Sequence, residues 1–115
     1  MEALYDRFGR VRAWLDAGAG HILAPDGRPL AFIDRGSVYG WTGRHLGWWR
    51  DGHMRDGAGA VAVCIADAAH LGVAMPALAP KPAPPARGAA PGRPAKDPEP
   101  ARPANKPAWS AYVPF

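Results

Sequence analysis

The chain has 115 residues, of which 48% are apolar and 21% charged, and it carries a formal net charge of +4. This length suits one small domain, and no apolar run approaches the roughly 20 residues of a membrane-spanning helix. The first ten residues mix acids with arginines, unlike a secretory signal, and the single cysteine excludes an internal disulfide framework. We therefore expect a cytoplasmic protein without a membrane partner.

Composition divides the chain into two parts near Met75. Residues 76–115 hold 12 of the 14 prolines, whereas residues 1–75 hold 12 of the 14 glycines. Eight arginines balance eight acids in residues 1–75, so the six basic and two acidic residues of 76–115 give the whole +4. The sequence predicts a folded domain over residues 1–75 and a basic, Pro/Ala-rich tail over residues 76–115.

The first part contains four similar segments, each centred on a glycine. These glycines are 18, 16 and 16 residues apart: Gly9, Gly27, Gly43 and Gly59. Each segment has an apolar stretch before the glycine and a longer aromatic or β-branched stretch after it, which predicts a β-hairpin with glycine in the turn. The extra two residues of the first interval fit an insertion at Ala19–Gly20. Asp-x-Gly signals mark the next turn in Asp16–Gly18 and Asp34–Gly36, with Arg50–Gly52 as a variant.

Eight short strands at this spacing predict an all-β meander. Glycines are too closely spaced for a ten-residue helix in residues 1–60. Val61–Ile65 is predicted as strand, while Ala66–Leu71 is open to a short helical turn. Four near-equal hairpins favour closure around a pseudo-fourfold axis, because closure removes sheet edges.

Alternation along the strands assigns two faces to this closed sheet. A small residue repeats in three segments and suits the crowded axis: Ala13, Ala31 and Gly47. The next residue is aromatic and must face the other way: Trp14, Phe32 and Trp48. Because both faces are then apolar, we predict that Trp14 and Trp48 are buried by the tail or by a second chain.

The segments LYDRFGRVRAWLD, DGRPLAFIDRGSVY and TGRHLGWWRDGHMRD resemble the 4-fold beta flower proteins, which are small, mostly bacterial proteins without an assigned activity. The resemblance covers about residues 3–67, is most specific at Gly43–Gly52, and leaves the tail outside. It implies four hairpins around a pseudo-fourfold axis and brings no catalytic residues. Ala60 departs from the pattern, since the other three segments have arginine there.

Histidine, cysteine and acidic residues of the first part are the candidates for catalytic or metal-binding chemistry. His21 and His53 occupy equivalent positions, either as ligands or bases brought together or as solvated turn residues; the second interpretation is favoured because no third ligand has zinc-type spacing. Cys64 replaces an aromatic residue and is interpreted as apolar filling. The acids Asp16, Asp34 and Asp56 are interpreted as turn residues. We expect no enzyme, metal or cofactor.

Three arginines follow the turn glycines: Arg10, Arg28 and Arg44. Together with Trp14 and Trp48 they form a candidate anion or partner surface, since guanidinium groups supply charge and rings supply stacking. The alternative is that they cover the tryptophan edges or pair with aspartates. The balanced charge of residues 1–75 favours this second interpretation.

The tail is predicted to be extended polyproline II, either as a solvated linker or as a ligand for an aromatic groove. Its end is rich in aromatic residues, and Trp109, Tyr112 and Phe115 are predicted to anchor it on this domain, a second copy or another protein. The sequence thus favours a non-enzymatic interaction or structural module that self-associates through its tail. The alternative is an anion- or nucleic-acid-binding protein that uses Arg10, Arg28, Arg44 and the basic tail.

Overall fold

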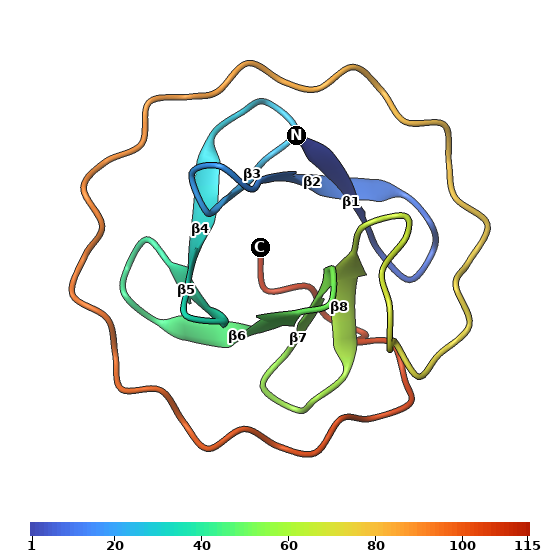
Figure 1. Ribbon diagram of the computed structural model, residues 1–115. Coiled ribbons are helices and arrows are strands. Elements are labelled where there is room, and N and C mark those ends of the chain that lie inside the picture. The colour runs from blue at the N-terminus through green and yellow to red at the C-terminus, as the bar shows by residue number, and fades with distance from the viewer.

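The chain forms an eight-stranded antiparallel barrel in a computed structural model that describes residues 1–115 (Figure 1). The strands follow one another around the barrel in chain order: β1 (Glu2–Tyr5), β2 (Val11–Asp16), β3 (His21–Leu23), β4 (Pro29–Asp34), β5 (Ser37–Gly40), β6 (His45–Arg50), β7 (His53–Arg55) and β8 (Val61–Cys64). A single pairing of Tyr5 with Cys64 closes β1 onto β8. The predicted meander and its circular closure are confirmed.

The four predicted glycine turns join the strands of each hairpin. Gly9, Gly27, Gly43 and Gly59 have φ between +74° and +89°, a region that L side chains rarely adopt. In the first hairpin, the N–H of Gly9 donates to the carbonyl of Asp6, and the other three turns repeat this bond. The tips of these hairpins point outward like petals (Figure 1).

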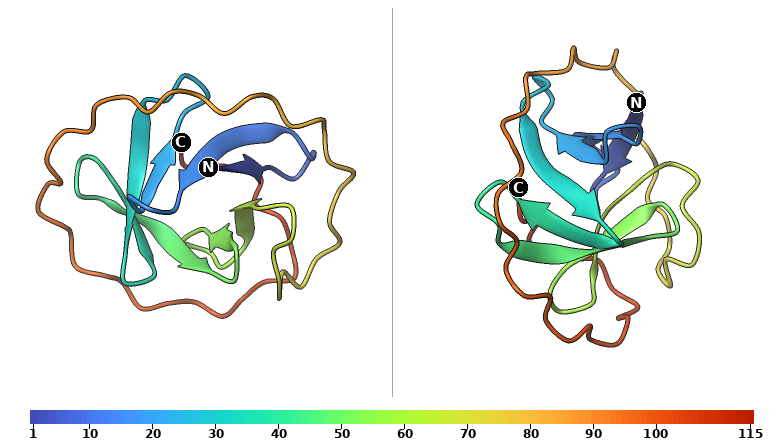
Figure 2. Two further views of the ribbon diagram at one scale, coloured as in Figure 1. Left: turned by 45° about the horizontal axis from the view of Figure 1, so that its top comes forward. Right: turned by 60° about the vertical axis from the view of Figure 1, so that its left-hand side comes forward.

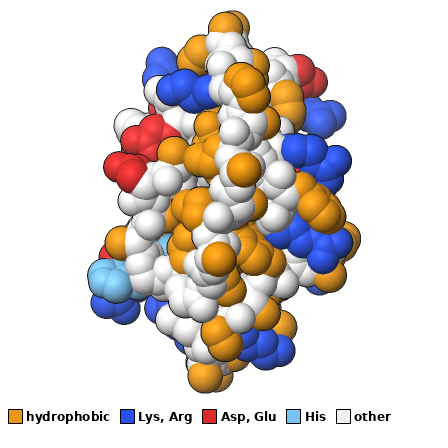
Figure 3. All heavy atoms as spheres, turned by 90° about the vertical axis from the view of Figure 1, so that its right-hand side faces the viewer, with side chains coloured by type: hydrophobic (Ala, Val, Ile, Leu, Met, Phe, Trp, Pro, Cys, Tyr) orange, Lys and Arg blue, Asp and Glu red, His pale blue; other side chains and the backbone are white.

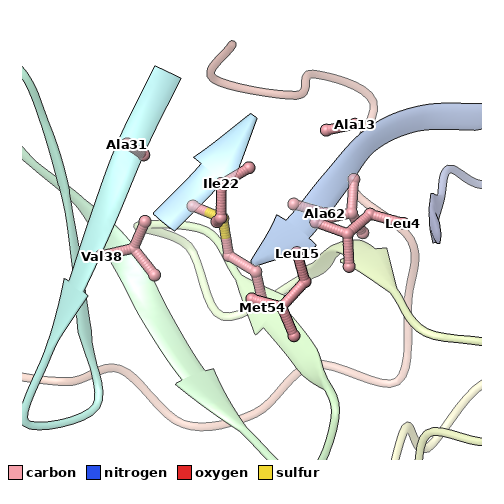
Figure 4. Packing of buried hydrophobic residues seen from close by; sticks show 9 residues of the cluster. Leu4, Ala13, Leu15, Ile22, Ala31, Val38, Met54 and Ala62 are labelled. Carbon is pink, nitrogen blue, oxygen red and sulfur yellow. The ribbon is translucent and has the colours of Figure 1, made fainter. Parts of the chain in front are cut away.

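The barrel interior contains the small residues that alternation assigned to the axis, together with larger apolar residues. Nine buried residues form the cluster: Leu4, Ala13, Leu15, Ile22, Ala31, Val38, Met54, Ala62 and Val63. Their side chains converge inside the barrel (Figure 4). A Cβ added to Gly47 would overlap the carbonyl oxygen of Arg55. The predicted crowding of the small residues is therefore confirmed.

A second kind of turn connects one hairpin to the next. Arg35–Gly36 and Asp51–Gly52 are two-residue turns with positive φ at both positions, as type I′ requires. In the first connection, Gly20 takes the role of Gly36, because its carbonyl accepts from Ile33 as that of Gly36 accepts from Trp49. The extra residues therefore lie within Ala17–Ala19. The placement of the insertion at Ala19–Gly20 was wrong, whereas Gly18 lies within the turn, as predicted.

The segment after β8 is not helical. The N–H of Ala69 donates to the carbonyl of Asp51 (3.0 Å), which ties the segment to the β6–β7 turn and leaves no helical pattern of bonds. The helical turn considered for Ala66–Leu71 was wrong for this reason. No helix in the structure could span a membrane.

The tail makes a nearly complete circuit around the barrel (Figures 1 and 2). Its sequence contains a nine-residue repeat that begins with Pro-Ala, at Pro76, Pro85, Pro94 and Pro103. These four prolines are partly buried, whereas most of the tail around them is exposed. Four nine-residue units at ~3.1 Å per residue span roughly 110 Å. That length is close to the perimeter of a molecule measuring 37 × 36 Å across.

Each repeat of the tail docks on one hairpin turn. In each repeat, the residue two positions after the repeated alanine donates its N–H to the carbonyl of a turn glycine, at 2.8–2.9 Å. The four pairs are Ala79 with Gly9, Gly88 with Gly27, Asp97 with Gly43, and Lys106 with Gly59. The carbonyl of the alanine itself occupies the space that a Cβ on the glycine would need. The turn glycines thus serve two purposes, the positive φ of the turn and the close approach of the tail.

Ion pairs reinforce this docking. Arg87 binds Asp16 (2.5 Å), and Lys96 binds Asp34. From the edge of the molecule, hydrophobic side chains gather along the middle, with lysines and arginines on both sides (Figure 3). Barrel and tail therefore form one packed unit within a single chain.

Candidate interaction surface

The last docking point carries the first aromatic residue of the tail. Val61 bonds to the carbonyl of Ala108 and to the N–H of Ser110, at 3.0 and 2.8 Å, as an added parallel bridge beside β8. Trp109 lies between them, packs on the buried cluster at β8, and donates its Nε1–H to the carbonyl of Ala74 (3.1 Å). Trp109 thus fixes the tail to the barrel.

Beyond Trp109 the chain turns inward and ends at the barrel axis (Figure 1). Val113 and Phe115 pack against the interior cluster, and the guanidinium of Arg12 donates two hydrogen bonds to the main-chain oxygen of Phe115 (3.2 and 2.8 Å). Tyr112 is 74% exposed. Of the three predicted anchor residues, Trp109 and Phe115 therefore contact the barrel, while Tyr112 faces solvent.

The three arginines after the turn glycines surround this closing segment without meeting. Arg10, Arg28 and Arg44 are exposed, and each lines a different depression beside Ser110–Phe115. Arg10 lies 3.6 Å from the carboxylate of Asp6. Symmetry thus repeats the guanidinium around the axis but does not gather the three into one site.

The predicted tryptophans lie away from these arginines, under the tail. Trp14 and Trp48 are 1% and 5% exposed, which confirms their predicted burial. Trp14 belongs to a buried cluster against which Leu78 of the tail packs. Trp48 donates its Nε1–H to Glu99 of the tail (2.9 Å), and this hydrogen bond lowers the pKa of Glu99. These rings therefore hold the tail and do not form an exposed stacking surface.

A different pair of aromatic residues is exposed. Phe8 and Tyr112 are the exposed large hydrophobic side chains, and both line one depression of about 200 Å³ between the first hairpin and the end of the tail. Arg7, Arg10 and Arg12 line the same depression. The guanidiniums of Arg7 and Arg10 lie 4.5 and 4.7 Å from the Phe8 ring centroid, within cation–π range. We call this site the aromatic–arginine depression.

The acid in this depression is held by the turn. Asp6 accepts the N–H groups of Phe8 and Arg10 at 2.9 and 3.1 Å, and Asp56 makes the equivalent bonds in the fourth hairpin. Its carboxylate therefore shapes the turn that presents Phe8, and the depression keeps an excess of positive charge.

A family model for the 4-fold beta flower protein matches residues 2–113. The chain belongs to this family. The matched range runs through all four hairpins and all four docking points of the tail, so the expectation that the resemblance stops near residue 67 was wrong. No curated protein and no solved structure matches the chain.

The two equivalent histidines of this 4-fold beta flower protein have different surroundings. His21 packs edge-on against Trp41, with ring centroids 5.1 Å apart, and His53 is 3% exposed beside Asp51. Burial lowers the pKa of both rings. No group of three histidine, cysteine or acidic side chains is arranged to hold a metal ion.

The single cysteine of the beta flower barrel is enclosed. Cys64 is fully buried, and its Sγ lies 3.7 Å from the sulfur of Met75. Burial raises the pKa of the thiol to about 11. The group is therefore a thiol at neutral pH, in a site without solvent access.

Sequence reasoning missed Arg55, which is 3% exposed. Its Nη1 donates to the carbonyls of Gly59 and Lys106, and its Nη2 to those of His70 and Leu71, at 2.8–3.3 Å. One side chain thereby joins the fourth hairpin, the segment after β8 and the tail. The other hairpins have Tyr5, Leu23 and Tyr39 at this position, so the departure from the apolar pattern was a readable signal.

Proposed function

We propose that the protein is a non-enzymatic interaction module that self-associates through the aromatic–arginine depression. The observation that carries this proposal is the convergence of Phe8 and Tyr112, which are 57% and 74% exposed, on one depression. Single exposed hydrophobic side chains are common, but adjacent ones that form a patch mark an interaction site, and aromatic and arginine residues are enriched at protein interfaces.

The chemistry of the depression is complementary to itself. Each copy presents rings and guanidiniums side by side, and in a twofold pair the ring of one copy faces the guanidinium of the other. Tyr112 has a free ring, and Arg7 and Arg10 already lie over Phe8 at cation–π distance. A second copy would therefore repeat contacts of a kind that the first hairpin makes within one chain.

The tail takes part in this surface, as the sequence suggested. Tyr112 and Val113 line the depression from the tail, and Phe8 lines it from the barrel. The surface is consequently complete only while the tail is docked, and self-association depends on the tail through its last residues.

Sedimentation velocity over a range up to about 200 μM tests self-association on the full chain. We expect a concentration-dependent dimer for the wild type, a monomer for the double variant Phe8→Ser/Tyr112→Ser, and wild-type behaviour for Lys81→Ala, which removes a tail cation outside the depression. A wild type that stays monomeric throughout this range would refute self-association.

A second candidate is binding of an anionic polymer. Support comes from Arg10, Arg28 and Arg44, which recur around the same end of the barrel. Retention of a labelled single-stranded oligonucleotide that weakens with salt, and that is lost in the triple alanine variant, would favour this function. Retention that does not depend on these arginines would refute it.

A further inference from the structure

Two of the four quarters of the seam between barrel and tail lack an ion pair, and in one of these two the seam is lined by charged side chains. In two quarters an aspartate at the end of a long strand pairs with the third residue of a tail repeat: Asp16 with Arg87, and Asp34 with Lys96. In the next quarter the strand β6 ends at Arg50 and the third residue of the tail repeat is Asn105. Arg50 thus stands where the other two strands have aspartate, and Asn105 stands where the other two repeats have a basic residue. No ion pair therefore joins the barrel to the tail in this quarter.

The largest depression of the molecule lies at this place, about 620 Å³ in volume. We call it the seam depression. Its polar lining comes from the barrel, the segment after β8 and the tail: Arg50, Asp51, His53, His70, Arg102 and Asn105. It lies at the ends of the strands opposite to the glycine turns, and it shares no residue with the aromatic–arginine depression.

The lining presents mainly hydrogen-bond donors. The guanidinium of Arg50 is 70% exposed, and that of Arg102 bonds only to Asn105 of the next tail repeat (3.3 Å). His53 is nine-tenths buried or more; its Nδ1 lies 3.4 Å from the carbonyl of Asp51, and its Nε2 has no protein partner. This nitrogen is not among the buried unpartnered atoms of the protein, so it is accessible to a ligand from the depression.

The one carboxylate in the lining is already occupied. Asp51 receives a hydrogen bond from His70 (2.9 Å) and lies 3.8 Å from Arg50. His70 has a φ of +59°, uncommon for a residue other than glycine, and this backbone conformation directs its ring to Asp51. Asp51 thus contacts His70 closely and Arg50 only loosely, and the guanidinium of Arg50 stays largely exposed.

We propose that the seam depression binds a tetrahedral oxyanion, phosphate or the phosphate group of a small phosphomonoester. Arg50 and Arg102 supply charge-assisted donors, which bind phosphate oxygens well. The Nδ1–H of His53 faces the carbonyl of Asp51, so its Nε2 is an acceptor for the hydrogen of a protonated phosphate oxygen. The volume exceeds that of a phosphate group, which leaves space for the organic part of an ester.

Such a ligand would join the two parts of the molecule. Arg50 and His53 belong to the barrel, while Arg102 and Asn105 belong to the tail. An anion held between them would do in this quarter what the ion pairs of Asp16 and Asp34 do in theirs. Binding should therefore protect the tail as well as stabilise the barrel, which a loosely attracted counterion would not do.

Isothermal titration of the full chain at constant ionic strength tests the proposal, with inorganic phosphate, phenyl phosphate and chloride as probes. We expect phosphate binding with a Kd below about 1 mM and none with chloride. Loss of one guanidinium, in Arg50→Ala or Arg102→Ala, should weaken binding about tenfold or more. Tighter binding of phenyl phosphate than of phosphate would identify an ester as the ligand, and equal or weaker binding would identify the free anion.

Arg93→Ala is the matched control. Arg93 has the position in its repeat that Arg102 has in the next one, but it bonds to the carbonyl of Ala19 and lies over Phe32, outside the seam depression. This variant should bind phosphate within about twofold of the wild type. The absence of phosphate binding, or an equal loss in Arg93→Ala and Arg102→Ala, would overturn the proposal. The site is independent of self-association, so either proposal can fail without the other.

Discussion

A methyl group on Gly43 should separate the role of the turn from the role of tail docking. Gly43 has a φ of +89°, and an added Cβ would overlap the carbonyl oxygen of Ala95. Alanine at positive φ costs about 1–2 kcal/mol. Displacing the tail also breaks the bond from the N–H of Asp97 to Gly43, a further loss of about 0.5–1.5 kcal/mol. Gly43→Ala should therefore lower the free energy of unfolding by about 2–3 kcal/mol.

Gly36→Ala provides the control for this experiment. Gly36 also has positive φ, +79°, but its added Cβ would meet nothing closer than the carbonyl oxygen of Trp49 at 3.6 Å. This variant should show only the backbone cost of about 1–2 kcal/mol, measured by urea denaturation. Equal losses for Gly36→Ala and Gly43→Ala would refute the idea that docked tail contributes to stability at this turn.

Limited trypsin digestion reports on the tail directly. Proline follows four of the six basic residues of the tail, which leaves the bonds after Arg87 and Lys96 as the good cleavage sites. The bond after Lys96 precedes Asp97, whose N–H is held by Gly43. Gly43→Ala should accelerate cleavage after Lys96 more than after Arg87. Unchanged cleavage after Lys96 would mean that the tail adapts to the methyl group without leaving the barrel.

Three further outcomes are expected. Trp48→Ala should cost about 3–5 kcal/mol in urea denaturation, whereas Trp48→Phe, which keeps an aromatic ring but loses part of the indole and the bond to Glu99, should cost less, about 1–3 kcal/mol. The hydrogen bond from Arg87 lowers the pKa of Asp16 from 3.8, so the carboxylate stabilises the fold above that pH, and this contribution is lost as the pH falls through the lowered pKa. Asp16→Asn should accordingly flatten the pH dependence of stability below about pH 5. Cys64, with its pKa raised to about 11, should resist a disulfide reagent at pH 8 until the protein unfolds, and rapid labelling of the native chain would contradict its burial.

The barrel could be predicted from the sequence because its repeat is marked by residues that allow few alternatives. Gly9, Gly27, Gly43 and Gly59 require positive φ, and the alternation of Ala13 with Trp14 fixes which face meets the axis. The inserted residues were misplaced because Gly18 and Gly20 are both able to form a turn. The structure distinguishes them by the positive φ of Gly20 (+70°) and by the hydrogen bond between Gly20 and Ile33.

The arrangement of the tail was also present in the sequence but in a different period. Pro-Ala recurs every nine residues from Pro76, whereas the hairpins recur every 16 to 18 residues. A sequence alignment of the two parts therefore does not show that their repeats correspond. Both parts contain four repeats, and this equality is explained by the structure, in which the tail runs around the outside of the barrel and each tail repeat docks on one hairpin. The exposed aromatic–arginine depression could not be derived from either repeat, because Phe8 and Tyr112 come from opposite ends of the chain.

The nine-residue period places a strict condition on insertions and deletions in the tail. Polyproline II has about three residues per turn, so nine residues make three whole turns and return the same side of the tail to each hairpin. One added residue between Pro85 and Pro94 would rotate everything after it by roughly 120°, turning both the Ala95 carbonyl and the Asp97 N–H away from Gly43. Three added residues would restore the rotation but shift the docking points along the circuit. Only a change of nine residues, matched by the gain or loss of one hairpin, preserves both the rotation of the tail and the positions of its docking points. Tail length and hairpin number are therefore bound to change together.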